Sequence, residues 1–127
     1  MDIQKTRSYY NNQTRENVCQ CDYCQNFIDE VKGAYPEVAE YLSSLGVDIG
    51  RPFEVFLPIE TGNGYMDYYG VQYLVIGNRD GFQETEIGDI SVRIAASYPD
   101  ATYKGEYFVI GLGTFHIKCR DDKYEFM

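Results

Sequence analysis

The chain has 127 residues, 44% of them hydrophobic, and a formal net charge of −9 at pH 7. This length fits a single domain spanning 1–127, and a chain of this size buries about two-thirds of its unfolded surface, which is enough for a hydrophobic core. The negative charge opposes binding to nucleic acid and to anionic membranes, so we expect neither as a partner.

The N-terminal segment, residues 1–18, is polar and shows little periodicity. It predicts a loose arm or an edge strand, with ordered structure beginning near Asp22. The segment has no apolar region of the kind that a secretory signal needs. The chain also has no apolar run near the roughly 18 residues of a membrane span. We therefore expect a cytoplasmic protein with reduced cysteines.

Two short helices are predicted next, over 22–33 and 36–45. Asp22 can cap the first helix, and Gln25 follows three residues later. Pro36 suits the first turn of the second helix, and Gly46 can end it in the left-handed conformation. Apolar residues recur at helical spacing in both segments: Cys24, Phe27, Ile28 and Val31, then Val38, Tyr41, Leu42 and Leu45.

The pattern changes to strands after Gly50. Alternation over 53–60, interrupted by Pro58, predicts an edge strand. Residues 65–76 are apolar on both faces, which predicts a central strand. Residues 90–96 alternate cleanly and predict a half-buried strand.

The last predicted strands cover 107–112 and 115–119, either as a hairpin at 111–113 or as one strand with a glycine bulge. Helices followed by strands indicate an α+β fold, with the pair of helices packed on a largely antiparallel sheet of about five strands.

Cysteines supply the one concentrated chemical feature. Cys19, Cys21 and Cys24 lie within six residues, at the start of the first predicted helix. Zinc takes four thiolate or imidazole ligands in a tetrahedron, and the gap between Cys21 and Cys24 is typical of zinc knuckles. Cys119 and His116 are the candidates for the fourth ligand.

Strand geometry favours Cys119 over His116. In a regular strand Cys119 shares the inward face with Phe115 and Ile117, whereas His116 faces outward with Lys118. The sequence therefore predicts a structural zinc site at Cys19, Cys21, Cys24 and Cys119. It also predicts that Cys24 and Cys119 point into the core between the helices and the sheet.

Two other interpretations of the cysteines stay open. Cys21 and Cys24 at a helix N-terminus could serve a thiol-dependent redox enzyme, since a helix start lowers thiol pKa values. However, no buried strand precedes the motif, and Asp22 places negative charge beside the thiols. Alternatively the cysteines are packing residues, because free cysteine is among the most buried residue types.

The residues Cys19-x-Cys21-x-x-Cys24-x-Asn26-Phe27, followed by Tyr41-Leu42-x-x-Leu45-Gly46-Val47-Asp48, resemble a segment of uncharacterised small bacterial proteins. The resemblance covers the first third of the chain. It implies a bacterial source and no particular activity.

Other catalytic signals are missing from the sequence. His116 is the only histidine, no serine lies in a nucleophile elbow, and no phosphate-binding loop occurs. Tyrosine is abundant and suits interfaces as well as strands. The tyrosines considered for a protein-binding sheet surface are Tyr65, Tyr68, Tyr69, Tyr73, Tyr98, Tyr103 and Tyr107.

These observations predict a small acidic, non-enzymatic binding or interaction domain with no catalytic residues. One alternative is the redox enzyme that uses Cys21 and Cys24. The other is an acidic inhibitor or immunity-type protein, in which the charge of −9 steers a basic partner onto the surface.

Overall fold

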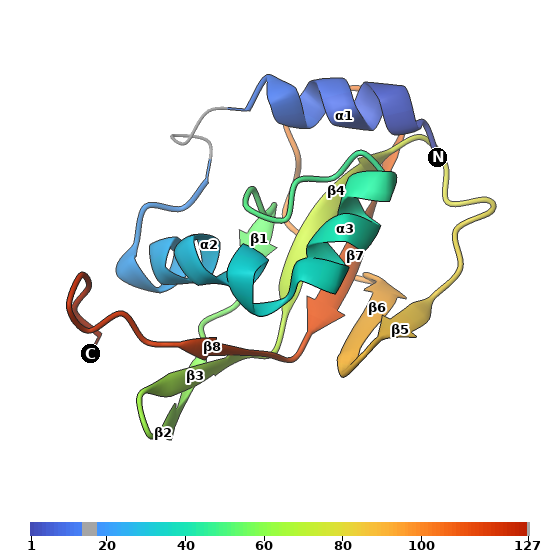
Figure 1. The fold of residues 1–127 in the computed structure, drawn as a ribbon. Coiled ribbons are helices and arrows are strands. Elements are labelled where there is room, and N and C mark those ends of the chain that lie inside the picture. Colours follow the sequence, from blue (N-terminus) through green and yellow to red (C-terminus); the bar gives the residue numbers. More distant parts are fainter. Residues whose placement is uncertain (14–17, 127) are drawn as a thin grey trace.

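The computed structural model describes residues 1–13 and 18–126. Three helices and two antiparallel sheets make up the described part of the chain, as the sequence predicted for an α+β fold (Figure 1). The helices are α1 (Ile3–Asn11), α2 (Asp22–Ala34) and α3 (Pro36–Ser44). The strands are β1 (Glu54–Val55), β2 (Ile59–Gly62), β3 (Tyr65–Tyr68), β4 (Val71–Ile76), β5 (Thr85–Ile87), β6 (Ile90–Ile94), β7 (Tyr107–Gly113) and β8 (Phe115–Lys118).

The first helix corrects the prediction of a loose arm or edge strand over 1–18. Asp2 caps α1 by accepting a hydrogen bond from the Lys5 backbone N–H. The Thr6 hydroxyl accepts from the Ile76 backbone N–H at 3.0 Å, and the Tyr10 hydroxyl donates to the Leu74 carbonyl at 2.8 Å. Helix α1 is therefore held on strand β4 by polar contacts rather than by an apolar stripe. The rest of the predicted arm includes residues 14–17, which lie outside the described residues.

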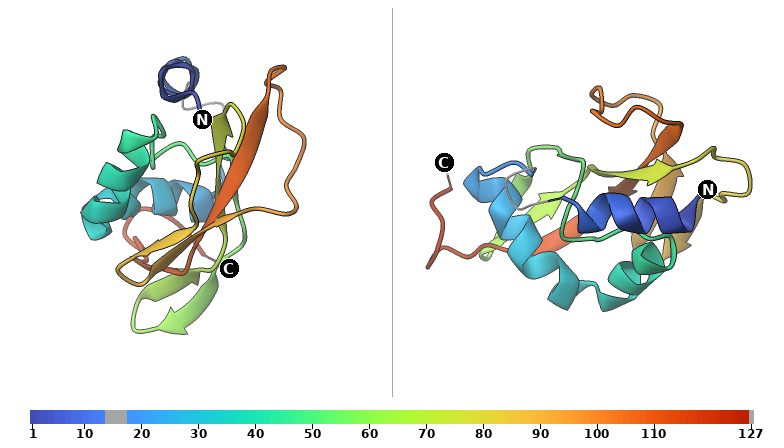
Figure 2. Two further views of the ribbon diagram at one scale, coloured as in Figure 1. Left: turned by 90° about the vertical axis from the view of Figure 1, so that its right-hand side faces the viewer. Right: turned by 90° about the horizontal axis from the view of Figure 1, so that it is seen from above.

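The prediction of two further helices is confirmed. Helix α2 buries Phe27 and Val31, and α3 begins at Pro36 and buries Val38 and Leu42. Both helices lie on one side of the strands, and they pack against each other (Figure 2, left). The chain of residues 95–106 runs on the other side of the larger sheet, where the Ser97 carbonyl accepts a hydrogen bond from Gln72.

Two sheets take the place of the single predicted one. The larger has the order β1-β4-β7-β6-β5, and the smaller has the order β2-β3-β8. Half-burial of β6 is confirmed, because Ile90 and Val92 are buried while Arg93 is exposed. The edge strand predicted over 53–60 is two short strands, β1 and β2, each at the edge of its own sheet.

The single strand predicted over 65–76 is wrong in one respect, because it breaks into β3 and β4 at Tyr69 and Gly70. The hairpin considered at 111–113 is also absent: β7 and β8 follow each other in different sheets. Strand β3 pairs with β8, and β4 pairs with β7, all antiparallel. The chain from β3 to β4 and the chain from β7 to β8 therefore pass between the two sheets next to each other. Their backbones are in close contact there, because a Cβ atom added to Gly113 would lie 2.4 Å from the Tyr69 carbonyl oxygen.

The aromatic core joins α2 to the smaller sheet. The Phe27 ring lies 5.1 Å from the Tyr68 ring and 5.3 Å from the Phe115 ring, and all three side chains are fully buried. Alternation along β8 places Phe115 and Ile117 inside.

None of the helices in the described part of the chain combines the length and the apolar character that a membrane-spanning helix needs.

Gly46 is expected to be essential to the contact between α1 and α3. Its φ is +85°, and an added Cβ would lie 2.6 Å from the Ile3 carbonyl oxygen and 2.9 Å from the Arg7 backbone nitrogen. Gly46→Ala should lower the free energy of unfolding by about 2 kcal/mol, because the left-handed conformation is unfavourable for alanine and α1 blocks its methyl group.

Urea unfolding of Gly46→Ala beside Gly33→Ala measures this effect. Gly33 lies in α2, and an added Cβ there meets no atom within 4 Å, so the control should gain up to about 1 kcal/mol of helix stability. Equal stabilities for the two variants would contradict the assigned role of Gly46.

Candidate metal centre

Three thiols meet at the N-terminal end of α2. The sulfur atoms of Cys19, Cys21 and Cys24 all lie within 4.8 Å of one another, which is close enough to bind one metal ion. Zinc–sulfur bonds of about 2.3 Å in a tetrahedron place ligand sulfurs about 3.8 Å apart, so only a small closure is needed. Cys19 and Cys21 are exposed and Cys24 is buried, and all four cysteines of the chain are free thiols.

Backbone hydrogen bonds of the helix start organise the three thiols. Cys21 is the N-cap residue of α2, and its Sγ accepts from the Cys24 backbone N–H at 3.4 Å. The Cys19 Sγ accepts in turn from the Cys21 backbone N–H at 3.5 Å. The prediction that Asp22 caps the helix is therefore wrong by one residue, because the cap lies within the cysteine cluster itself. Gln25 fixes the approach to the helix, since its Nε2 donates to the Cys19 carbonyl at 2.8 Å.

The thiols differ in acidity because their surroundings differ. The hydrogen bond from the Cys21 backbone N–H, followed by weaker hydrogen bonds from neighbouring thiols, lowers the pKa of the Cys19 thiol. Burial raises the pKa of the Cys24 thiol, since removal from water disfavours the thiolate. The Cys19 thiol therefore ionises more readily than the Cys24 thiol.

A pH series of alkylation should reveal this order in metal-free protein. Because its pKa is lowered and its side chain is exposed, Cys19 should reach half-maximal reaction with iodoacetamide at a lower pH than Cys24. Cys24 should react last, since burial both raises its pKa and blocks access. Mass spectrometry of each labelled peptide measures the two profiles, and Cys24 reacting before Cys19 would contradict the order.

Cys119, the predicted fourth ligand, lies outside the group of three. It directly follows β8, is half-buried and packs against the hydrophobic core, and its backbone N–H donates to the Gly64 carbonyl at 2.7 Å. Burial raises the pKa of its thiol, and the charges of Asp121 and Glu60 raise it further. The predicted inward position is confirmed for Cys24, whereas Cys119 is only partly covered.

His116 faces away from α2, as the alternation of the strand predicted. Its Nδ1 lies 2.7 Å from a carboxylate oxygen of Asp67, and its ring stacks on Tyr65 at 4.5 Å. Both partners lie on the exposed face of the smaller sheet. Among the described residues His116 therefore has no part in the cysteine cluster.

Tyr68 is a neighbour of the cluster that sequence reasoning assigned only to a general tyrosine surface. It is fully buried, and its hydroxyl donates to the Tyr23 carbonyl at 2.6 Å. Burial raises the pKa of its phenol, and the charges of Cys24, Cys119 and Cys21 raise it further. Alternation with the exposed Tyr65 and Tyr69 was the signal that could have placed it inside.

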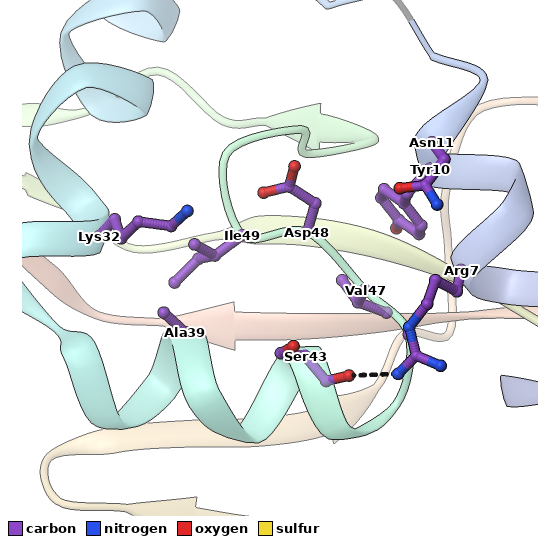
Figure 3. A pocket seen from close by; sticks show the side chains of 10 residues that line it. Arg7, Tyr10, Asn11, Lys32, Ala39, Ser43, Val47, Asp48 and Ile49 are labelled. Atoms are coloured by element: carbon purple, nitrogen blue, oxygen red, sulfur yellow. Dashed lines mark hydrogen bonds between the residues drawn. The ribbon is translucent and has the colours of Figure 1, made fainter.

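A separate cavity of about 230 Å³ lies between α1, α3 and the chain that follows α3 (Figure 3). Arg7 reaches across its mouth and donates to the Ser43 carbonyl at 3.2 Å. Asp48, on the chain that follows α3, accepts a hydrogen bond from the Gly50 backbone N–H, and its carboxylate lies 3.5 Å from the Arg51 guanidinium. Arg7 and Asp48 thus already have hydrogen-bond partners within the protein, so this cavity is a weaker candidate for a binding or catalytic site than the cysteine cluster.

Comparisons of the chain with protein-family models, with curated proteins and with solved structures found no match. The functional argument consequently rests on the residues themselves.

Proposed function

We propose that this chain is a small acidic binding domain, without enzymatic activity, in which a structural zinc ion holds the start of α2. The observation that carries the proposal is the approach of three free thiols to within 4.8 Å of one another. Like-charged thiolates repel one another, so a cation is the natural occupant of such a cluster. Free thiols also persist in reducing compartments, which supports a cytoplasmic location.

We further propose that the four zinc ligands are Cys19, Cys21, Cys24 and Cys119. Asn26 of α2 supports this set, because its side chain hydrogen-bonds to the Lys118 carbonyl and to the Arg120 backbone N–H, on either side of Cys119. Four thiolates would close the coordination sphere, leaving no position for a substrate, which is typical of structural rather than catalytic zinc.

Zinc stoichiometry of protein expressed in metal-replete medium tests the site. We expect one equivalent in the unchanged protein, loss in Cys21→Ser, and loss in Cys119→Ser with full retention in His116→Ala. Retention in Cys119→Ser would reject Cys119 as the fourth ligand. Absence of zinc from the unchanged protein would reject the metal centre and leave the cysteines as packing residues.

Removal of the metal should also lower the thermal midpoint, because metal binding and folding are coupled at such sites. Cobalt(II) substitution provides an independent readout, since its charge-transfer absorption reports the number of bound thiolates. A chelated protein that melts as the loaded one does would argue against a structural role.

A thiol-dependent redox enzyme that uses Cys21 and Cys24 is the alternative from a different class. The closeness of the thiols favours it, whereas burial raises the pKa of the Cys24 thiol and opposes attack by that group. Disulfide mapping after treatment with oxidised glutathione separates the two functions. Rapid, reversible formation of a Cys21–Cys24 disulfide favours the enzyme, and slow mixed oxidation favours the structural centre.

An acidic inhibitor or immunity-type protein is a narrower form of the binding proposal. The charge of −9 supports it. A tight complex with a basic protein that dissociates at high salt is its signature.

A further inference from the structure

The chain that follows β8 turns back onto α2, at the end of the molecule where that helix begins (Figure 1). We call residues 120–126 the 120–126 segment. It contains no helix or strand, only a turn in which the Lys123 and Tyr124 backbone N–H groups donate to the Arg120 carbonyl at 2.9 Å. Contacts with α2, rather than pairing in a sheet, therefore set its position.

Charged groups attach this segment to the middle of α2. Arg120 lies 3.1 Å from Glu30, and the Lys123 ammonium lies 2.9 Å from Asp29. The Tyr124 hydroxyl donates to the same Asp29 carboxylate. The Asp29 and Glu30 side chains are only 18% and 24% exposed, so water and salt screen these ion pairs less than they screen ordinary surface pairs.

The far end of the segment reaches the first turn of α2, which carries the cysteine cluster. The Glu125 backbone N–H donates to an Asp22 carboxylate oxygen at 3.2 Å, and the Phe126 ring lies 5.2 Å from the Tyr23 ring. Both partners on α2 stand between the second and third cysteines of the cluster. This end of the segment therefore contacts the residues that separate two of the proposed metal ligands.

The near end of the segment adjoins the fourth proposed ligand, because Cys119 directly precedes Arg120. Asn26 of α2 holds the backbone on both sides of Cys119: its Nδ2 donates to the Lys118 carbonyl at 3.0 Å, and its Oδ1 accepts from the Arg120 N–H at 2.8 Å. One ion bound by the four thiols would fix the residue before the segment and the helix turn on which its other end packs.

Without a metal ion, the thiols hold that helix turn weakly. Cys21 caps α2 through a sulfur atom 3.4 Å from the Cys24 backbone N–H, and a thiol sulfur is a weak acceptor. Helix ends with weak caps open locally at little cost. An ion bound to Cys19, Cys21 and Cys24 would fix their separations, and with them the positions of Asp22 and Tyr23.

We propose that metal binding at the cysteine cluster and docking of the 120–126 segment on α2 are coupled, so that the segment is held when zinc is bound and released when zinc is lost. By linkage, docking must raise the affinity for zinc by the same factor by which zinc favours docking. The inference rests on the proposed zinc site and adds a device through which zinc controls access to one side of α2.

Limited digestion with trypsin, in zinc or in a chelator, measures docking of the segment. We expect cleavage after Lys123 to be about tenfold slower in zinc, since cleavage follows the population of the released form when opening and closing are fast. Lys104 provides the control site, because it is exposed in the chain 95–106 on the other side of the larger sheet. Cleavage after Lys104 should not depend on zinc.

The zinc affinity of variants, measured in competition with a chromogenic chelator, tests the coupling from the other side. Lys123→Ala removes a positive charge, which by electrostatics alone would tighten zinc binding, whereas loss of docking should weaken it by about threefold or more. Lys104→Ala removes the same charge on the other side of the larger sheet and should leave the affinity unchanged. Tyr124→Phe alters no charge, removes the hydroxyl contact with Asp29 and should also weaken zinc binding.

The outcomes separate the coupling from the metal centre. One equivalent of zinc, with equal cleavage after Lys123 in zinc and in chelator, rejects the coupling and leaves the metal centre in place. Tighter or unchanged zinc binding in Lys123→Ala rejects the coupling as well. Faster cleavage after both lysines in chelator shows a general loosening rather than release of the segment, which again rejects the coupling. A protein that binds no zinc rejects the metal centre and the coupling together.

Discussion

Replacement of Phe27 by alanine is expected to lower the free energy of unfolding by about 3–5 kcal/mol, the usual cost of removing a buried phenylalanine. Phe27 is fully buried, and its ring contacts Tyr68 and Phe115 on the inner side of the smaller sheet. These contacts connect α2 to that sheet, so the variant leaves a cavity where the two layers meet.

Equilibrium unfolding in urea measures the loss, with Leu57→Ala as the control. Leu57 is 68% exposed, and its truncation should change stability by less than about 0.5 kcal/mol. Should Phe27→Ala fail to fold, Phe27→Leu offers a milder test, with an expected cost of about 1–2 kcal/mol. Comparable losses for Phe27→Ala and Leu57→Ala would contradict the assigned core.

Asn26→Ala is expected to cost about 3 kcal/mol, because it leaves two partly buried backbone groups without partners. Asn26 is fully buried; its Nδ2 donates to the Lys118 carbonyl at 3.0 Å, and its Oδ1 accepts from the Arg120 backbone N–H at 2.8 Å. This side chain thereby covers the free edge of β8, as a neighbouring strand would elsewhere.

Hydrogen exchange of the Arg120 amide adds a local readout. We expect protection of this amide to fall in Asn26→Ala by more than the global loss of stability explains. Glu40→Ala, on the exposed face of α3, is the control and should leave both quantities unchanged. Unaltered protection at Arg120 would show that Asn26 is not what covers the strand edge.

Local sequence patterns predicted those helices and strands in which the buried apolar residues recur at regular spacing. Helices α2 and α3 follow apolar stripes, and β6 follows strict alternation, so their positions agree with the sequence to within a residue or two. Helix α1 was not predicted in this way, because its buried residues are Thr6 and Tyr10, which contact β4 through their hydroxyl groups. A polar side chain gives no periodic signal until its partner strand is known.

The cysteine cluster was predictable in part for the same reason. Cys19, Cys21 and Cys24 are close in sequence, and any chain turning into a helix at this point brings them near one another. The position of Cys119 depended on long-range contacts: its backbone N–H donates to the Gly64 carbonyl, and Asn26 of α2 binds the backbone on either side of it. Alternation could predict its direction but not its distance from the other thiols.

The sequence by itself determined the α+β class, the two central helices, the acidic surface and the local cluster of three thiols, because each follows from residues near one another in the chain. The tertiary structure alone decided that the sheet divides in two at Tyr69 and Gly70. Residues 65–76 are apolar throughout, and this pattern is compatible both with one strand in one sheet and with two strands in two sheets. It also decided which tyrosines face water: Tyr68 and Tyr73 are buried, while Tyr65 and Tyr69 are exposed. The pairing between strands distant in the sequence determines which side of each strand faces the core, and local sequence patterns do not specify that pairing.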